Sequence, residues 1–346
     1  FIEHFFVAST HAYLLFFTNR GQCYWLKVYD IPQLGRTSAG RAIVNVLSLR
    51  AEEKISSVIP VRRFDTTSHL LMATRRGLVK KTALDAYSRP RSGGLIGIHL
   101  EEGDDLIGVV LTQPGDEVVL STRQGMAIRF DEADVRAMGR DTRGVKGINL
   151  SGEDAVVGLV VADPQGYLLT VCENGYGKRT PFGANVAGFE DGDESLEASA
   201  STESTVPEAT SDGEAEAQEG GATEERSAMR YRKQRRGGKG LRDIRTTDRN
   251  GPVVAVTAVR DGDEFMVITQ QGMVTRMRVD EIRIIGRNTQ GVRLMNLQET
   301  DKVVTVAKIA REDVDGQGAE APAEPPPDAP PGELPVAEAD QSEPTD

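Results

Sequence analysis

The sequence predicts an all-β, propeller-like fold of repeated blades, because two glycines recur at regular intervals and stretches with helical periodicity are nearly absent. The first glycine of each repeat unit is the last residue of an octapeptide in which apolar or β-branched residues precede a polar pair. These five glycines are Gly21, Gly77, Gly125, Gly175 and Gly272. The second follows in every unit, at Gly40, Gly94, Gly144, Gly240 and Gly291. Repeats of about 50 residues with four short β-rich runs are typical of propellers.

Each unit begins with a predicted β-hairpin. In the first unit the apolar run LLFFT (14–18) precedes the turn, and the β-rich run QCYWLKV (22–28) follows it. Glycine suits the tight turn between two such runs. The second glycine is followed four residues later by an apolar residue, at Val44, Ile98, Ile148, Ile244 and Met295. A last β-rich run, such as KISSVIPV (54–61), closes the unit.

Five complete blades and the end of a sixth are predicted. The segment FIEHFFVAST (1–10) matches a closing run rather than an opening hairpin, so we expect the beginning of that sixth blade upstream of this chain. The fourth unit is longer than the others because residues 190–225 interrupt it.

The net charge of -12 is unevenly distributed. Residues 1–189 carry +2 and residues 226–311 carry +10, whereas the tracts 190–225 and 312–346 carry -13 and -11. Both tracts contain too few apolar residues to offset the entropy lost on ordering. We therefore predict a single domain over residues 1–311 with a disordered acidic insertion at 190–225, and a disordered, Pro-rich acidic tail at 312–346.

The stretch RYRKQRRGGKGLRD (230–243) is the most basic part of the chain. Its QRRGGKG segment occupies the place just before the repeated second glycine, and every other unit has at least one arginine there. Equivalent loops of successive blades would place these cations in succession around the rim. Guanidinium groups pair bidentately with phosphate, and glycines let a polymer backbone approach closely.

The pattern predicts sequence-tolerant binding of duplex nucleic acid by charge and deformability. Aromatic residues do not interleave with the basic loops, which argues against stacking of single strands. No recognition helix is apparent, which argues against direct readout of bases.

Other classes of protein are disfavoured. The four histidines are scattered over the first hundred residues, and there is no metal-ligand spacing, phosphate loop or nucleophile elbow. We expect no catalytic residue and no cofactor in this chain. The isolated Cys23 and Cys172 suit a reducing, cytoplasmic setting, and no apolar run approaches the roughly 18 residues that a membrane span needs.

The residues resemble the C-terminal β-pinwheel family of the bacterial DNA gyrase A subunit. Gln234–Gly240 matches the family's signature heptapeptide Q-R-R-G-G-[RK]-G throughout, and FVASTHAYLLFFTNRGQCYWLKVYDIP (6–32) and ENGYGKRTPF (173–182) are also similar to it. In the family the principal heptapeptide lies in the first blade, before the FVAST strand. We therefore expect the principal copy upstream of this chain and interpret 234–240 as a further contact on the rim.

The resemblance implies a domain that wraps duplex DNA with positive handedness, so that ATP-driven strand passage adds negative supercoils. It implies the rest of the gyrase A subunit and the B subunit as partners in an A2B2 holoenzyme, with ATP and Mg on other domains. The residues predicted to contact DNA are Gln234, Arg235, Arg236, Gly237, Gly238, Lys239, Gly240, Arg230, Arg232, Lys233, Arg36, Arg41, Arg89, Arg91, Arg140, Arg143, Lys146, Lys178, Arg179, Arg287 and Arg293.

Two alternatives remain at this point. One is the homologous substrate-binding domain of topoisomerase IV, whose blades usually lack a recognisable heptapeptide. The other is a protein-interaction propeller, which would not need cations at equivalent loops. The acidic tracts either compete with DNA for the basic rim or act as solvating, salt-adapted segments.

Overall fold

The computed structural model describes residues 8–35, 38–91, 93–183, 230–298 and 300–309. The chain divides into two units, Phe1–Ala310 and Arg311–Asp346, and all described residues belong to the first. The predicted insertion at 190–225, the tail at 312–346 and the first seven residues of the predicted closing run lie outside the described residues.

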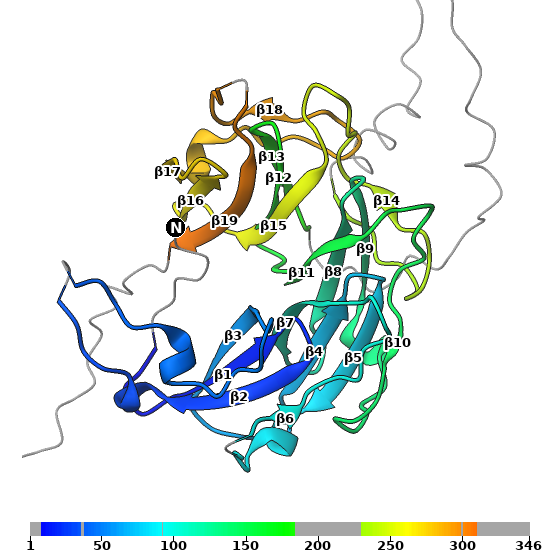
Figure 1. The fold of residues 1–346 in the computed structure, drawn as a ribbon. Coiled ribbons are helices and arrows are strands. Elements are labelled where there is room, and N and C mark those ends of the chain that lie inside the picture. The colour runs from blue at the N-terminus through cyan, green and yellow to red at the C-terminus, as the bar shows by residue number, and fades with distance from the viewer. Residues whose placement is uncertain (1–7, 36–37, 92, 184–229, 299, 310–346) are drawn as a thin grey trace, which may run out of the picture. The chain divides into compact units, whose positions relative to one another are not determined.

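The described strands form five antiparallel sheets that follow one another in chain order (Figure 1). From the inner to the outer edge, the first contains β3 (Ile55–Val61), β1 (Tyr13–Thr18), β2 (Gln22–Lys27) and β6 (Leu95–Ile96). The second contains β7 (Leu106–Thr112), β4 (His69–Thr74), β5 (Leu78–Ala83) and β10 (Val145–Lys146). The third contains β11 (Val156–Val161), β8 (Glu117–Thr122), β9 (Met126–Asp131) and β14 (Leu241–Arg242).

The fourth sheet contains β15 (Val253–Val259), β12 (Tyr167–Cys172), β13 (Tyr176–Pro181) and β18 (Val292–Arg293). The fifth contains β19 (Val303–Ile309), β16 (Glu264–Thr269) and β17 (Val274–Arg278). The described helices are short 3₁₀ segments: η1 (Val28–Asp30), η2 (Ile43–Asn45), η3 (Leu84–Tyr87), η4 (Glu132–Asp134) and η5 (Val279–Glu281). The prediction of an all-β propeller arrangement with five blades is confirmed, but the fifth sheet has three described strands where four were predicted. The predicted end of a sixth blade lies mostly outside the described residues.

Each of the first four sheets takes its outer strand from the following repeat unit. The two-residue strand β14 belongs to the fourth unit, yet it pairs with β9 of the third, where Leu241 lies opposite Ala127. Strands β6, β10 and β18 make the same exchange onto β2, β5 and β13. The repeated second glycine begins this exchanged segment, so the basic loop of one unit lies on the sheet of the preceding unit.

The exchange explains both repeated glycines. Gly125 has φ +82°, and a Cβ atom there would lie 2.1 Å from the carbonyl oxygen of Ile244 in the exchanged segment. Gly240 has φ +81°, and a Cβ atom there would lie 2.6 Å from the carbonyl oxygen of Ala127. Only glycine combines a left-handed backbone with so close an approach.

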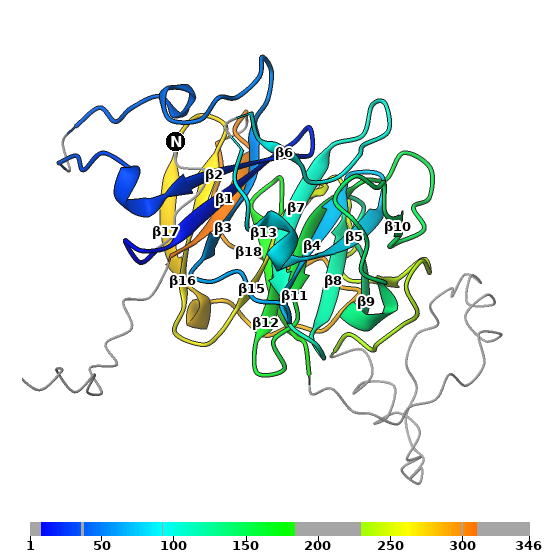
Figure 2. The ribbon, with the colours of Figure 1, turned by 90° about the horizontal axis from the view of Figure 1, so that it is seen from below.

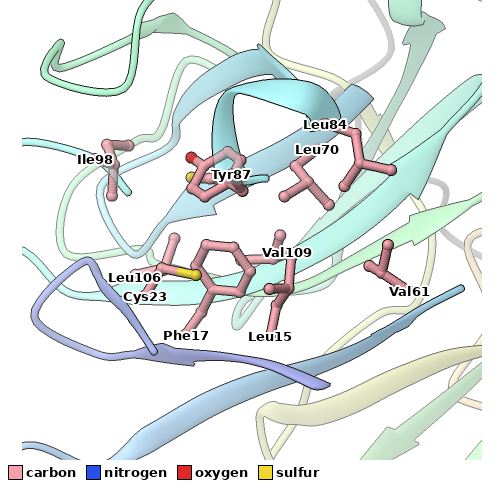
Figure 3. Packing of buried hydrophobic residues seen from close by; sticks show 11 residues of the cluster. Leu15, Phe17, Cys23, Val61, Leu70, Leu84, Tyr87, Ile98, Leu106 and Val109 are labelled. Carbon is pink, nitrogen blue, oxygen red and sulfur yellow. The ribbon is translucent and has the colours of Figure 1, made fainter. Parts of the chain in front are cut away.

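Successive sheets pack through their inner strands β3, β7, β11, β15 and β19, all labelled in Figure 1; Figure 2 shows the same sheets from below. Between the first and second sheets, the ring of Phe17 meets that of Tyr87 edge to face, with centroids 5.8 Å apart (Figure 3). The indole nitrogen of Trp25 donates to the carbonyl oxygen of Tyr87 at 2.8 Å. These contacts hold the first and second sheets against each other.

Candidate nucleic-acid interface

The exchanged segments and the loops before them form a structure that we call the rim belt, composed of residues 89–91, 93–99, 138–149, 234–245 and 285–293. Hydrogen bonds join each of its segments to the next. The backbone amides of His99, Asn149 and Arg245 donate to the carbonyl oxygens of Thr142, Gly238 and Thr289, at 3.0, 2.8 and 2.7 Å. The basic loops of four repeat units are thereby held in one continuous series.

The loop at 234–240 is fixed at its start and in its middle. The amide of Gln234 donates to the carbonyl oxygen of Arg129 on β9 at 2.8 Å, and the amide of Gly237 donates to that of Gly147 at 2.7 Å. The guanidinium of Arg236 donates to the carbonyl oxygens of Asp134 and Lys146. Arg236 therefore ties this loop to the previous one, while Arg235 and Lys239 are exposed.

A buried polar network lies beneath the same loop. The carboxylate of Asp243 accepts hydrogen bonds from the hydroxyls of Thr170 at 2.7 Å and Tyr231 at 2.5 Å, and it lies 2.8 Å from the ammonium of Lys178. Burial is the main cause that raises the pKa of Tyr231 well above its usual value, so this phenol remains a hydrogen-bond donor. The network anchors both Tyr231, before the loop, and Asp243, after it.

Lys178 and Arg179 correct the sequence prediction. Both were predicted to contact DNA, but Lys178 is fully buried and Arg179 is 7% exposed. Lys178 donates to the carbonyl oxygens of Asp243 and Gly286, at 2.7 and 2.9 Å. Arg179 donates to the carbonyl oxygen of Ile282 at 2.6 Å and stacks over the ring of Tyr167. Both cations hold the structure together and are not available to a phosphate.

Lys80 repeats this role at the second sheet. It is fully buried and donates to the carbonyl oxygens of Gly97 and Arg140. Gly97 belongs to the exchanged segment of its own unit, and Arg140 belongs to the loop that arrives from the next. Lys80 and Lys178 therefore each connect two consecutive segments of the rim belt from below.

Most of the other predicted cations lie at the surface. Exposed side chains among them are Arg41, Arg89, Arg91, Arg143, Lys146, Arg230, Arg232, Lys233, Arg235, Lys239 and Arg293. Arg140 and Arg287 are half-buried, and Arg36 lies outside the described residues. Some are already ion-paired: Lys233 lies 3.2 Å from Asp131 and 3.5 Å from Glu117. Arg41 lies outside the rim belt, whereas Arg89, Arg91, Arg140, Arg143, Lys146, Arg235, Lys239, Arg287 and Arg293 belong to it.

Arg242 and Arg249 are surface arginines that were not among the predicted contacts. Arg242 stands opposite Met126 in the outer strand of the third sheet, the register position that Lys146 and Arg293 occupy in the second and fourth. Counting two residues beyond the second glycine would have found it. Arg242 and Lys239 line a hollow of about 200 Å³ that also includes Asn149 and Ser151. Arg249 lies in the loop after β14, which has no counterpart with the same residue in the other repeat units.

Other kinds of site are not indicated in the part of the chain that the structure describes. That part contains no cluster of three or more His, Cys, Asp or Glu side chains placed to hold a metal ion. It also contains no helix of the length and hydropathy required to cross a membrane.

Comparisons with known proteins agree with the fold and the repeat. The sequence model of the family described as "DNA gyrase C-terminal domain, beta-propeller" matches residues 12–62, 68–113, 116–163, 230–260 and 263–310. The DNA gyrase A subunit of Salmonella typhimurium is 40% identical over 93% of this chain, and that of Escherichia coli is 38% identical over 92%. The chain spans about a third of the length of these curated relatives, 31% and 32%.

Two solved structures are similar. One is the C-terminal domain of DNA topoisomerase IV, with a TM-score of 0.67 and 25% identity over 87% of this chain and 80% of that one. The other is a DNA gyrase A C-terminal domain, with a TM-score of 0.65 and 22% identity over 88% of this chain and 84% of that one, a likeness that concerns the fold. Family match, relatives and repeat architecture agree, and the chain belongs to the DNA gyrase C-terminal domain family of β-propellers.

Proposed function

We propose that this chain binds double-stranded DNA along the rim belt and wraps it without reading base sequence. The observation that supports this most strongly is the continuity of the belt, in which hydrogen bonds connect basic loops from four repeat units. A polyanion that follows the belt would meet a cation from each of these four units in turn. Charge and the deformability of the duplex would then supply the affinity.

The wrapping role gives the chain a place in a larger enzyme. By its family, the chain would act with the rest of a gyrase A subunit and with the B subunit, and lead one DNA segment over another before strand passage. Cleavage, ATP hydrolysis and Mg binding would belong to other domains of that A2B2 assembly. The contribution of this chain would be the positive sense of the wrap, which strand passage converts into negative supercoils.

A topoisomerase IV substrate-binding domain is the second candidate, because the C-terminal domain of DNA topoisomerase IV has a similar fold. The heptapeptide Gln234–Gly240 favours the gyrase role, since it is the family's signature. The gyrase role requires a wrap of positive handedness, so an assay of DNA topology tests it.

A salt titration of binding to linear duplex tests the proposal. If about eight phosphates are neutralised, the logarithm of the association constant falls with the logarithm of salt concentration with a slope near -7. Duplexes of unrelated sequence should give the same slope and nearly the same affinity. A flat salt response would overturn the proposal, and so would binding confined to one sequence.

A further inference from the structure

Two arginines converge on one phenol at the outer edge of the fourth sheet. The hydroxyl oxygen of Tyr176 accepts hydrogen bonds from Nε of Arg249 at 3.2 Å and from Nη2 of Arg293 at 2.9 Å. Both guanidinium groups also face the tyrosine ring, with Cζ 5.2 and 5.4 Å from its centroid. Tyr176 is buried, whereas both arginines are exposed.

The backbone that carries each arginine is held in place. Arg293 lies in β18, where it pairs with Tyr176 across the sheet. Arg249 lies in a loop that is fixed by Asn250, whose fully buried side chain donates to the carbonyl oxygens of Arg245 and Gln290 at 2.9 and 3.1 Å. The loop is also held by Asn174, whose side-chain amide donates to the carbonyl oxygen of Asp248 at 3.0 Å.

The charge of this group is not balanced by a carboxylate among the described residues. Among the described residues neither Arg249 nor Arg293 forms an ion pair with Asp or Glu; the other side-chain partner of Arg293 is the neutral Asn296. Hydrogen bonds from the two arginines lower the pKa of the Tyr176 phenol, as expected where positive potential is concentrated. Two cations on one neutral oxygen repel each other, and an anion between them would relieve that repulsion.

We propose that Arg249 and Arg293, oriented by Tyr176, form a clamp that binds one backbone phosphate of duplex DNA. A guanidinium offers five N–H donors in a planar fork, so each arginine can serve the phenol with one edge and a phosphate with another. The equivalent pairs in the second and third sheets are Lys146 with Leu78, and Arg242 with Met126, which lack a phenol that could hold a second cation. This clamp rests on the proposed DNA-binding function.

The test compares Arg249→Gln, Arg293→Gln and the double variant in salt titrations with a duplex of roughly 40 base pairs. Because the arginines share one phosphate, the double variant should lower the magnitude of the log–log slope by about 0.9, and each single variant, which leaves one cation on that phosphate, should lower it by less. Affinity at low salt should fall roughly tenfold in each. Tyr176→Phe should weaken binding less, because it removes only the orienting oxygen.

Matched controls are Arg260→Gln and Tyr167→Phe. Arg260 is an exposed arginine already paired with Asp163, and Tyr167 is a tyrosine that stacks with the buried Arg179. Both controls should bind like the unaltered chain, and urea unfolding should show that all variants are folded. Arginine Nε–Hε resonances of Arg249 and Arg293 should shift on addition of duplex, and much less with the same phosphate concentration of inorganic phosphate.

The outcomes separate the clamp from the function on which it rests. If the unaltered chain binds duplex with a steep salt slope while the arginine variants match Arg260→Gln, the clamp is refuted and the proposed function stands. If the magnitude of the log–log slope is lower by about 1.8 in the double variant, the arginines contact two phosphates and the shared clamp is refuted. If the resonances respond equally to inorganic phosphate, the assignment to a DNA phosphate is refuted. If the unaltered chain does not bind duplex, both proposals fail.

Discussion

The ammonium nitrogen of Lys178 lies 2.8 Å from Oδ1 of Asp243, and both side chains are buried beneath the basic loop. Lys178 is on β13 of the fourth sheet, while Asp243 directly follows β14, the outer strand of the third. The pair therefore links two neighbouring sheets at the point where the rim belt passes from one to the other. A buried pair of this kind is costly to break, because either partner alone is a buried, uncompensated charge.

Removal of one partner should strongly destabilise the domain. We expect Asp243→Asn and Lys178→Met each to lower the free energy of unfolding by about 3–5 kcal/mol. The double variant Lys178→Met, Asp243→Leu should lose less than the sum of the two, because no unpaired charge is left. Urea unfolding monitored by circular dichroism measures each value.

The exposed pair formed by Lys302 and Glu173 is the control for this prediction. Its nitrogen and oxygen are 3.2 Å apart, but the lysine side chain is 51% exposed. Lys302→Met should cost less than about 1 kcal/mol. Equal losses of unfolding free energy for the buried and the exposed pair would show that burial does not determine how much Lys178 and Asp243 contribute to stability.

Lys80 should make stability depend on pH. Burial, the main cause, lowers its pKa from 10.5 to about 7. An unfolded lysine keeps its proton up to about pH 10.4, so between pH 7 and 10 the unfolded chain binds more protons than the folded one. The free energy of unfolding should therefore rise with pH over this interval, and the penalty for burying the charge is fully present below pH 7.

The variant Lys80→Met isolates this contribution. Between pH 7.5 and 9.5 the unaltered chain should gain about 2 kcal/mol more than the variant does, since one pKa unit corresponds to about 1.4 kcal/mol. Urea unfolding of both proteins at the two pH values measures the difference. The same pH dependence in both would mean that Lys80 keeps an ordinary pKa.

The second repeated glycine should not tolerate a side chain. Gly240→Ala would force φ +81° on a residue with a Cβ atom and push that atom against the carbonyl oxygen of Ala127. We expect a loss of about 2–3 kcal/mol and weaker DNA binding, because the exchanged strand would move. Gly139→Ala is the control, since a Cβ atom at Gly139 would meet nothing within 4 Å. Comparable losses at both positions would refute the role given to Gly240.

The exposed cations of the heptapeptide should act on binding and not on stability. Arg235→Gln and Lys239→Gln should each lower the magnitude of the salt slope by about 0.9, with unfolding free energies within about 0.5 kcal/mol of the unaltered chain. Lys178→Met should do the opposite: it should lower the free energy of unfolding and leave the salt slope of DNA binding unchanged when only folded molecules are compared. Fluorescence anisotropy with a labelled duplex and urea unfolding distinguish the two roles. Unchanged binding in both variants would place the DNA elsewhere.

The sequence was sufficient to predict the repeat, the hairpins and the all-β class, because apolar runs ending in glycine carry a strong local signal. It did not show which sheet receives the outer strand. A strand of two residues such as Leu241–Arg242 has no register pattern of its own. Its partner is chosen by contacts between units, such as Gly125 with the carbonyl of Ile244.

The burial of Lys178 and Arg179 was equally invisible in the sequence. Lysine and arginine side chains are mostly exposed in folded proteins, so both residues were expected at the surface. Their interior role depends on carbonyl oxygens from distant parts of the chain, at Gly286 and Ile282. Arg249 could not be predicted either, because its loop has no counterpart with the same residue in other units.

We propose that the chain wraps duplex DNA with positive handedness. It is tested most directly by sealing nicked circular DNA with ligase in the presence of increasing amounts of this chain, and then measuring the linking number after the protein is removed. A wrap of positive handedness predicts circles with a raised linking number, in proportion to the amount of protein bound. An unchanged linking number at saturating protein, or a lowered one, would contradict it.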